Sequence, residues 1–415
     1  MQLTDMTDAN LKRSLLDAEA VLGRGSVEAR ILRRELERRF KGEHSMPQTD
    51  SADLATACRV ISAAALLSAR VNENFLLKEY GAKVLERAHP RRDMSLKGLI
   101  EAACLLEERR SPITGEEDYL TAGFSTVSLP GILGDIAKKA MLEAYSDVPA
   151  VVPIFFGART VTNFREYTEY RVTGDETFES VGPGGEIPHG TLGEEHEHYQ
   201  VETHGKMFTI TRTMVIDDDL GAFLQIPRRF GRGAALTREK AGAKLIMNNT
   251  GNFFHADHKN LSTGIGSALG PAGLAVAEKL MLEQTDDAAG TNPVMIAPKL
   301  MLAPPALKGT ADDLFILNVI TANVTNKYRG LYAPSCWPYL GNAAFHASAS
   351  DAYWYLFADP TKTAAFLVAY LNGVDVPTIE RVAAGPNVLG TVWRAYFDFG
   401  VSQGDHRAAV RSNGA

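Results

Sequence analysis

The chain has 415 residues, is 45% hydrophobic and carries a formal net charge of −7. This length predicts two or three domains, and the apolar content is sufficient for a real core, which excludes a disordered chain. The negative charge excludes a generally basic surface, so a contact with nucleic-acid phosphates would need a local patch.

The cysteines and the apolar stretches indicate the compartment. Cys58, Cys104 and Cys336 lie far apart without a C-x-x-C pair, which favours neither a disulfide framework nor a zinc ribbon and suggests a reducing environment. The amino terminus lacks the basic start and apolar run of a signal peptide, and the uncharged stretch near 150–157 is too short to span a bilayer. We therefore expect assembly in the cytoplasm and no membrane contact.

The first quarter of the chain has helical periodicity. The apolar residues of 10–40 recur near helical spacing on both sides of a GRGS break, which predicts a helical hairpin. The polar stretch 42–53 is predicted to be a linker. A second helical region runs over about 54–108, and Pro90 should end one helix there and permit another. On this pattern alone, a small helical domain is the favoured interpretation.

A further helix is predicted at 129–145. Thr114 and Glu117 have the spacing of a capping box before it, and Ser128 is a candidate cap at its start. One face of this helix is apolar, formed by Ile132, Ile136, Ala140 and Ala144.

From 161 to 216 the periodicity changes to two, which predicts an extended hairpin. Tyr170 and Val172 alternate with Glu169 and Arg171, which is typical of a strand with one apolar face and one solvent-exposed, charged face. In the return strand the apolar parity switches near Gly205, where we expect a bulge or a twist. The polar connection between the strands is too long for an ordinary turn and too polar to form a core of its own. We therefore expect its apolar residues to pack against another chain.

A helix should follow at 217, where Asp217, Asp218 and Asp219 favour helix capping over metal binding. Pro227 is predicted to begin a second helix. Its apolar stripe comprises Phe230, Ala234, Thr237, Ala241 and Leu245. The glycines of this helix suggest close backbone packing, because each weakens a helix by about 1 kcal/mol relative to alanine. They are Gly231, Gly233 and Gly242.

The carboxy-terminal part mixes predicted helices, such as 306–321, with short strands, such as 294–296 and 352–357. Because these elements lack a regular strand-helix-strand rhythm, the fold class is expected to be α+β.

Enzyme motifs are incomplete. His196 and His198 would share one face of a strand, with His189 and His204 nearby, but histidines on an extended arm rarely converge with the geometry that zinc requires. The segment His255-Ala256-Asp257-His258 has the wrong spacing and acid for a metalloprotease helix and is predicted to be a loop whose side chains bond backbone groups. GIGSALG at 264–270 is predicted to be a turn rather than a dinucleotide fingerprint.

Five ordered segments carry a family resemblance. They are GGEIPHGTLGEEHEHYQVETHGKMFTITRTMVIDDDLGAFLQI at 184–226, LPGILGDIAKKAMLEAY at 129–145, NFFHADHKNL at 252–261, WYLFADP at 354–360 and WRAYFDFGV at 393–401. Together they resemble the major head (capsid) subunits of tailed phages, in particular the Mu-like prophage major head subunit family, over roughly 96–407. The stretch 321–346 departs from the family pattern, which leaves axial contacts open.

The resemblance implies a Hong Kong 97-type α+β fold in which an extended loop lies across neighbouring subunits. The implied parts are an amino-terminal helical, scaffold-like region 1–115, an amino-terminal arm 116–160, an extended loop hairpin 161–216, a spine helix and start of the peripheral domain 217–265, a mainly axial domain 266–350, and peripheral strands with the carboxy terminus 351–415. Contact residues expected on the extended loop are Gly185, Glu186, Gly190, Thr191, Leu192 and Lys206.

The implied function is that of a major capsid protein that self-assembles into an icosahedral shell around double-stranded DNA, without sequence-specific binding. The expected partners are other copies, as pentamers and hexamers, together with portal, maturation protease and decoration proteins. No catalytic residue, cofactor or metal is expected. The alternative is a metal-dependent hydrolase that uses the histidine-rich segments; it predicts stoichiometric zinc and a monomer or small oligomer.

Overall fold

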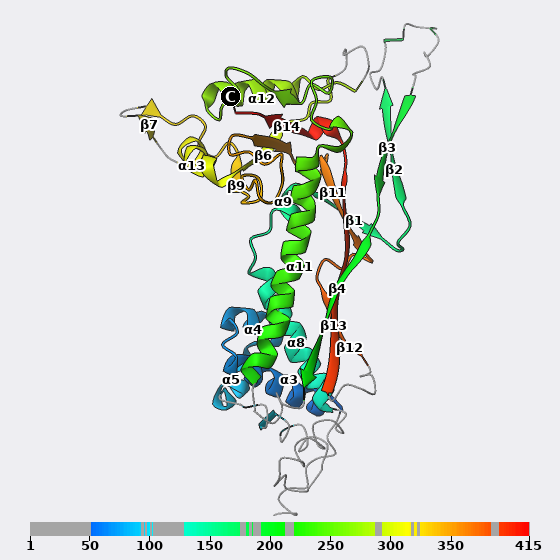
Figure 1. Ribbon diagram of the computed structural model, residues 1–415, viewed down its shortest axis with the longest axis vertical. Helices are drawn as coiled ribbons and strands as arrows, with labels where there is room; N and C mark the ends of the chain where they lie inside the picture. Colours follow the sequence, from blue (N-terminus) through cyan, green and yellow to red (C-terminus); the bar gives the residue numbers. More distant parts are fainter. Residues whose placement is uncertain are drawn as a thin grey trace, which may run out of the picture. The chain divides into compact units, whose positions relative to one another are not determined.

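The computed structural model describes residues 51–92, 95, 98–99, 102, 128–174, 180–181, 185, 192–211, 220–286, 293–316, 319–321, 324–382 and 390–414. The chain divides into two compact units, residues 1–60 and 61–415. The predicted hairpin at 10–40, the capping box at Thr114 and Glu117, and the triple aspartate at 217–219 lie outside the described residues. Helix α3 begins in the first unit, and every other element named below belongs to the second unit (Figure 1).

The helices are α3 (Ser51–Ser68), α4 (Glu73–Tyr80), α5 (Ala82–Ala88), η2 (His89–Arg91), α8 (Ser128–Ser146), α9 (Val152–Phe155), α11 (Leu220–Asn248), η3 (Thr250–Asn252), α12 (Pro271–Leu282), η4 (Pro305–Leu307), α13 (Lys308–Phe315) and η5 (His406–Ala408). In the part of the chain that is described, no helix combines the length and apolar content of a membrane span.

The strands are β1 (Gly157–Val161), β2 (Tyr167–Gly174), β3 (Leu192–Tyr199), β4 (Glu202–Thr211), β5 (Leu261–Ser262), β6 (Pro298–Ala303), β7 (Val319–Thr321), β8 (Val324–Thr325), β9 (Ala333–Cys336), β10 (Trp354–Ala358), β11 (Phe366–Leu371), β12 (Thr378–Val382), β13 (Gly390–Gln403) and β14 (Ala409–Ser412). Two five-stranded sheets are formed. The first has the order β1-β11-β13-β12 with β4 on the other edge of β13, and the second has the order β5-β14-β10-β6-β9.

These elements confirm the α+β class and the helical character of the region before Pro90. That region is more finely divided than the sequence pattern suggested, because breaks at 69–72 and Gly81 precede the one at Pro90. Asn72 caps α4 by accepting a hydrogen bond from the Asn74 N–H at 2.9 Å. The Asn72 N–H in turn donates to Glu143 Oε1 of α8 at 2.7 Å, which joins the two helices.

Helix α8 confirms the predicted helix at 129–145. Ile132, Ile136 and Ala140 of its apolar face are buried at 3%, 0% and 0% exposure. The prediction that Pro227 begins a helix is wrong, because α11 is continuous from 220 and Pro227 lies inside it. The buried stripe of α11 is also shifted by about one residue, so that Ala235 and Ala243 are buried where Ala234 and Ala241 are only partly covered.

Helices α8 and α11 pack closely because glycine lets their backbones approach. A Cβ on Gly231 would lie 2.0 Å from the Met141 carbonyl oxygen of α8. One on Gly242 would lie 2.5 Å from Val152 Cγ2, so this second glycine permits the approach of α9. Gly233 differs, since nothing lies within 4 Å of its Cβ position. The close-packing prediction is therefore confirmed for Gly231 and Gly242 and wrong for Gly233.

A buried acid fixes the chain after α8. Glu239 of α11 is 2% exposed, and its Oε2 accepts hydrogen bonds from the backbone N–H groups of Val151 at 2.9 Å and Val152 at 3.2 Å. These groups form the start of α9, where a carboxylate is favoured. The neighbouring Arg238 contacts Glu239 at 3.4 Å and donates to the Tyr145 hydroxyl, so α8, α9 and α11 share one buried polar junction.

The two large sheets share one apolar core built from aromatic rings. Phe366 of β11 in the first sheet lies 4.7 Å from Phe253 and 5.4 Å from Phe156, measured between ring centroids. The Phe366 ring also lies 6.1 Å from Phe357 of β10 in the second sheet. Such pairs stabilise a core beyond their buried area, so the sheets form a single packed body.

Three strand and helix predictions need correction. The expected strand at 294–296 lies before β6 rather than in it, and the helix expected at 306–321 ends at Phe315, followed by β7. No bulge occurs at Gly205, which pairs in regular register with Tyr396 inside β4. The apolar parity changes instead after the buried Val201, where the chain leaves β3 and enters β4 of a different sheet.

The glycines of α11 yield a matched test. Gly231→Ala should lower the free energy of unfolding by roughly 1–3 kcal/mol, because the new methyl group collides with the α8 backbone. Gly233→Ala should raise it by up to about 1 kcal/mol, because alanine favours the helix and meets open space. Urea unfolding of the unassembled subunit measures both, and equal effects of the two substitutions would contradict the packing described here.

Candidate functional site

The hairpin formed by β2 and β3 is a separate two-stranded sheet with regular antiparallel register from Tyr167↔Tyr199 to Gly174↔Leu192. Its two faces differ. Thr168, Tyr170, His196 and His198 lie on an exposed face, and the Tyr170 ring is 65% exposed with the His196 ring against it at 4.9 Å. The opposite face is partly covered by the body of the subunit.

The covered face is the charged one, which reverses the sequence interpretation. Glu169 and Arg171 were assigned to the wet face, but they turn towards the body while Tyr170 faces solvent. The reason is that the body offers charged partners rather than an apolar surface. We call residues 167–199 the hairpin and its covered side the inner face.

Aromatic contacts hold the hairpin at its base. The rings of Tyr167 and Tyr199 stack at a centroid distance of 5.8 Å with an interplanar angle of 8°. They pack on a small apolar cluster of Val161, Val201 and Ala369, each no more than 2% exposed. This contact is the hairpin's apolar attachment within the described residues, and it covers one cross-strand pair.

The next cross-strand pair on the inner face places two carboxylates directly opposite each other, Glu169 and Glu197. Like charges in this position are destabilising. Arg159 of β1 compensates by donating from Nε to Glu169 Oε2 at 2.7 Å and from Nη2 to Glu169 Oε1 at 3.1 Å. This bidentate geometry is a strong form of the arginine–carboxylate contact, but it engages only one of the two acids.

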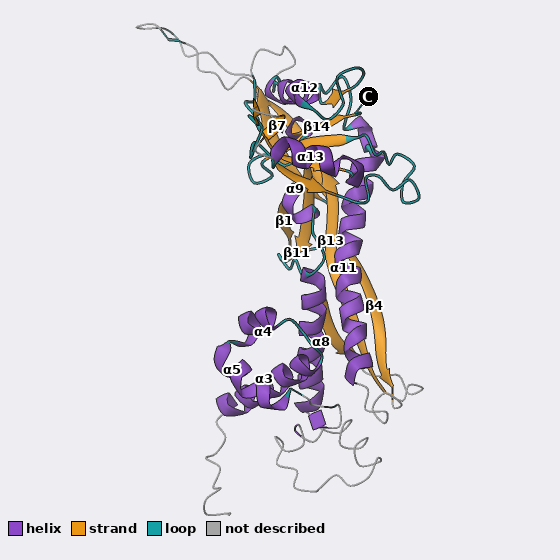
Figure 2. Ribbon diagram, turned by 90° about the vertical axis from the view of Figure 1, so that its left-hand side faces the viewer, coloured by secondary structure: helices purple, strands orange, loops and turns teal. Residues whose placement is uncertain are grey.

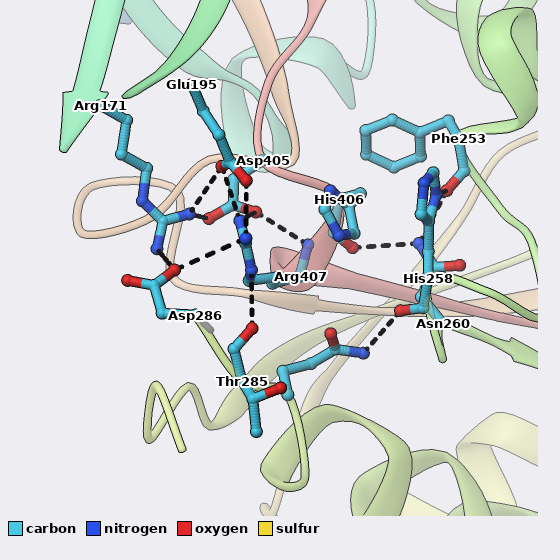
Figure 3. Close-up of polar contacts among 11 residues, drawn as sticks. Arg171, Glu195, Phe253, His258, Asn260, Thr285, Asp286, Asp405, His406 and Arg407 are labelled. Carbon is cyan, nitrogen blue, oxygen red and sulfur yellow. Dashed lines mark hydrogen bonds and ion pairs between the residues drawn. The ribbon is translucent and has the colours of Figure 1, made fainter. Parts of the chain in front are cut away.

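The third pair, Arg171 and Glu195, joins an ion cluster on the body (Figure 3). Arg171 contacts Asp405 and donates from Nη2 to Asp286 Oδ1 at 2.7 Å. Glu195 accepts two hydrogen bonds from Arg407, at 2.9 Å from Nη1 and 2.8 Å from Nη2. We call these five residues the latch, since they join both hairpin strands to the body.

The body side of the latch is rigid and buried. The side chains of Asp405 and Arg407 are 4% and 6% exposed. Asp405 Oδ1 accepts from the Arg407 backbone N–H at 3.0 Å, which caps η5, and Arg407 Nε donates to the Thr285 carbonyl at 3.1 Å. Because Asp405 and Arg407 are also held by contacts within the body, they can set the direction of the hairpin.

The contact between the inner face and the body contains more acidic than basic side chains. Glu169, Glu195, Glu197, Asp286 and Asp405 face three arginines, which would leave two uncompensated negative charges. Burial, followed by the charge of Asp405, raises the pKa of Glu197 to about 7. The hydrogen bonds from Arg407 instead lower the pKa of Glu195. Glu197 is thus the acid that takes up a proton near neutral pH.

The latch continues into the loop at 252–261. His406 lies between Asp405 and Arg407, and its ring is 4.3 Å from that of His258, whose Nδ1 lies 3.0 Å from the Phe253 carbonyl oxygen. Asn260 donates to the carbonyls of Phe253 at 2.8 Å and His406 at 3.0 Å (Figure 3). Burial, then the charges of Arg407 and His258, lower the pKa of His406 to about 4.

These contacts confirm that the His255–His258 segment is a loop whose side chains bond backbone groups. His255 Nδ1 accepts from the Asp257 N–H at 3.2 Å. Residues 264–270 form the predicted turn, which is anchored by Trp354 Nε1 donating to the Ser267 carbonyl at 3.0 Å. Within the described ranges, no group of three or more His, Cys, Asp or Glu side chains could hold a metal ion. Cys58 and Cys336 are free thiols.

The structure separates the contact residues expected from the sequence. Gly185 is exposed in the connection between the strands, and Leu192 is the first residue of β3. Lys206 is exposed but belongs to β4, where it pairs with Ala395, and is not on the hairpin. Glu186, Gly190 and Thr191 lie outside the described residues.

The latch itself was missed by sequence reasoning. Its members come from β2, β3, the bend after α12 and the segment before β14, so no local pattern joins them. The sequence signal that could have indicated the latch is the alternation of charged residues along both strands. It places Glu169 and Arg171 on one face of β2, and Glu197 and Glu195 opposite them on β3.

Comparison with known proteins decides the family. A model of the phage capsid protein family matches residues 194–412, from within β3 to the end of β14, which is more than half of the chain. The chain belongs to the phage capsid protein family. The matched range of this capsid protein contains α11, the second five-stranded sheet, all strands of the first except β1, and four of the five latch residues. No curated protein sequence matches the chain.

Several solved structures are similar to this capsid protein. The capsid structure of the cyanophage P-SCSP1u is 12% identical, with a TM-score of 0.43, and the match covers 63% of this chain and 87% of that one. The virus-like particle from Pyrococcus furiosus is 10% identical, with a TM-score of 0.40 and coverages of 67% and 98%. Mycobacterium phage Cain is 10% identical, with a TM-score of 0.39 and coverages of 66% and 88%. The family assignment rests on residues 194–412.

Removing the buried arginine of the latch should destabilise the subunit strongly. Arg407→Met leaves Glu195 without its two hydrogen bonds and removes one of the two arginines that face the buried Asp405, so we expect a loss of about 3–5 kcal/mol in urea unfolding. The matched control is Arg394→Met, which removes an exposed pair with Glu380 at 3.0 Å and should cost less than about 1 kcal/mol. A loss below 1 kcal/mol for Arg407→Met would contradict a structural role for the latch.

The stability of the subunit should depend on the proton of Glu197. Because its pKa is raised on folding, the folded state keeps a proton that the unfolded state releases, so this contribution falls as pH rises from about 4.5 to 7. His406 acts in the opposite sense, since its lowered pKa makes stability rise between about pH 4 and 6.5.

Glu197→Gln isolates the first effect. The wild-type stability minus that of the variant should decrease by on the order of 1 kcal/mol between pH 5 and 8, a value reduced to allow for solvent screening. Urea unfolding at a series of pH values measures the difference. A pH-independent difference would mean that Glu197 is ionised throughout.

Proposed function

We propose that this capsid protein is the major head subunit of a tailed bacteriophage or prophage-derived particle, and that its copies assemble into an icosahedral shell around double-stranded DNA. The observation that carries the proposal, beside the family match, is the hairpin. Its apolar attachment to the described part of its own body is a single aromatic pair, and the rest of its inner face is held by charge.

The exposed face of the hairpin favours a partner in the assembled state. A large apolar ring such as Tyr170, 65% exposed, is typical of a contact that another molecule covers. Residues that we propose to meet a neighbouring copy from the hairpin are Gly185, Glu186, Gly190, Thr191 and Leu192. Lys206 is proposed as a contact from β4 instead.

The order of elements supports a Hong Kong 97-type architecture. Helix α8 precedes the hairpin, and α11 follows it and packs on β13 and β4 of the first sheet (Figure 2). In this assignment 116–160 is the amino-terminal arm, 217–265 the spine helix with the start of the peripheral domain, 266–350 the mainly axial domain and 351–415 peripheral strands. The hairpin proper is shorter than 161–216, because β4 leaves it for the first sheet.

The proposal also includes the subfamily, the place of assembly, the further partners and the role of the amino-terminal region. We place the chain among the Mu-like head subunits, assembled in the host cytoplasm as pentamers and hexamers, without catalytic activity of its own. Portal, maturation protease and decoration proteins are its proposed further partners. Residues 1–115 are proposed to act in assembly as a scaffold-like region removed afterwards, and an intact amino terminus in the mass spectrum of mature particles would contradict removal.

Assembly is energetically reasonable for such a subunit. Stable obligate interfaces bury on the order of 2,000 Å² or more. At about 25 cal/mol per Å² of apolar area, contacts of this size add tens of kcal/mol before the costs of association are subtracted. Head-to-tail contacts between identical copies close into rings, and rings of two sizes can tile a closed shell.

Deleting residues 182–193 tests whether the hairpin bridges neighbouring subunits, which we call its bridging role. The subunit should remain soluble and folded, because the latch and the body are untouched, but electron microscopy should find no stable shells. The control replaces the same residues with a glycine-serine linker of equal length, which separates length from chemistry and should also fail. Normal shells from either variant would refute the bridging role, and an absence of particles from the intact protein, expressed with its neighbouring genes, would refute the proposed function.

A further inference from the structure

Helix α11 carries an excess of positive charge in a chain whose net charge is −7. Its 29 residues include six arginines and lysines and one acid, Glu239. This acid is 2% exposed and accepts hydrogen bonds from the backbone of Val151 and Val152, so it is turned away from the outer side of the helix. The charge that α11 presents on its exposed side is therefore positive.

Four of the six cations form one row along this side, and we call them the basic row. The row comprises Arg229, Arg232, Lys240 and Lys244, all of them exposed. At 3.6 residues a turn they fall within an arc of about 120°, and at 1.5 Å a residue they extend over about 22 Å. The other two cations are engaged elsewhere, since Arg228 pairs with Glu143 at 3.2 Å and Arg238 is buried beside Glu239.

The described part of the subunit does not neutralise the basic row. None of its four members forms an ion pair with a described residue. Lys240 and Lys244 stand four residues apart, a spacing at which like charges destabilise a helix. Helix α13 differs, because its Lys308 pairs with Asp312, four residues later, at 2.7 Å. The stability of the folded subunit therefore does not explain the row.

The surface beside the row also lacks acid. A groove of about 410 Å³ lies between α11 and the first sheet, where β4 runs beside the helix (Figure 2). Arg229 and Gly233 line it from the helix, and Lys206 lines it from β4. Among the described residues that line this groove, none is an aspartate or a glutamate. The positive charge of the row is therefore not offset on this side.

The chemistry of the row suits a chain of phosphates better than a protein partner. Protein interfaces depend on buried apolar anchors, and lysine is depleted from them. Between Arg229 and Lys244 the one further fully exposed residue is Gly233, which offers no anchor, and Leu236 is partly buried. Double-stranded DNA instead carries one negative charge per about 1.7 Å of its axis, which lysine and arginine neutralise without reading the base sequence.

We propose that the basic row is the surface through which the subunit contacts the phosphate backbone of the enclosed double-stranded DNA. In the shell, the exposed side of α11 then faces the interior. The contact is independent of base sequence, and the negative charge of the chain as a whole confines it to this row. The proposal rests on the proposed function, since that function supplies the DNA.

Binding of the full-length, unassembled subunit to a double-stranded DNA oligonucleotide tests the contact. Fluorescence anisotropy over a series of salt concentrations gives the slope of log K against log salt, which should be about −3.6, or about −0.9 for each of four phosphate contacts. A row variant replaces all four cations with glutamine, as Arg229→Gln, Arg232→Gln, Lys240→Gln and Lys244→Gln. It should bind at least tenfold more weakly at low salt and lose most of the slope.

A control variant removes the same charge elsewhere on the subunit. Its substitutions are Lys259→Gln, Lys327→Gln, Arg329→Gln and Lys362→Gln, at four exposed residues outside α11. This control should keep the wild-type slope. An equal loss of binding in both variants would show that net charge rather than the row attracts DNA, and this would overturn the proposal, as would an unchanged affinity of the row variant.

Competition separates DNA from an acidic protein partner. Unlabelled duplex should displace the bound oligonucleotide at a lower concentration than poly-glutamate of equal total charge. Displacement by poly-glutamate at an equal or lower concentration would overturn the assignment to DNA and favour an acidic protein segment.

Ultraviolet cross-linking of DNA-filled particles, followed by mass spectrometry, locates the contact in the shell. Cross-linked nucleotides should lie on peptides of α11, and cross-links confined to other parts of the chain would contradict the proposal. Electron microscopy of the wild-type protein reports on shell formation separately. Because DNA binding is measured before assembly, a failure of the basic row and a failure of the proposed function are distinguishable.

Discussion

The direction of the hairpin depends on the ion cluster between Arg171, Glu195, Asp286, Asp405 and Arg407. Among the described residues, hydrophobic packing fixes the two strands only at Tyr167 and Tyr199. Beyond that pair, the strands are held by hydrogen-bonded charges, of which Asp405 and Arg407 are almost completely buried. Charges in this setting contribute directional contacts more than net stability, which is the property that an arm reaching towards another molecule needs.

The body that supports the latch is rigid for different reasons. Its two large sheets share one aromatic core, and α11 lies close to α8 because Gly231 permits backbone contact. The buried Glu239 then joins the start of α9 to α11. The latch residues on the body follow directly from this packing, since η5 and the strand β14 connect Arg407 to the second sheet. The subunit thus combines a well-packed body with a hairpin held mainly by polar contacts.

Sequence reasoning identified the elements with strong local periodicity. Patterns within short windows of sequence predict helix α8, the long helix observed as α11, and the loop at 252–261. The α+β class follows from the same local patterns. Pro227 misled the prediction because tertiary packing of α11 outweighs the local penalty of an internal proline. The hairpin's faces were assigned in reverse, because the rule that charged residues face solvent fails where the body supplies buried arginine and aspartate partners.

The latch and the groove could not be predicted from the sequence in the same way. Arg171 and Asp405 are more than 200 residues apart, and their contact exists only because the hairpin base and η5 meet in the folded subunit. A groove lined in part by Gly233 forms because α11 and β4 are held apart. Their separation depends on the rings of Phe208 and Phe230, whose centroids are 5.6 Å apart. Both features arise from long-range packing rather than from local pattern.

Hydrogen exchange of the hairpin backbone, compared between unassembled subunits and shells, tests the central claim most directly. If the hairpin is held by its latch and completed by other copies, its amides should be protected near Arg171 and Glu195 in the free subunit and become protected along the whole of β2 and β3 only in the shell. Uniform slow exchange in the unassembled subunit, unchanged on assembly, would contradict the account.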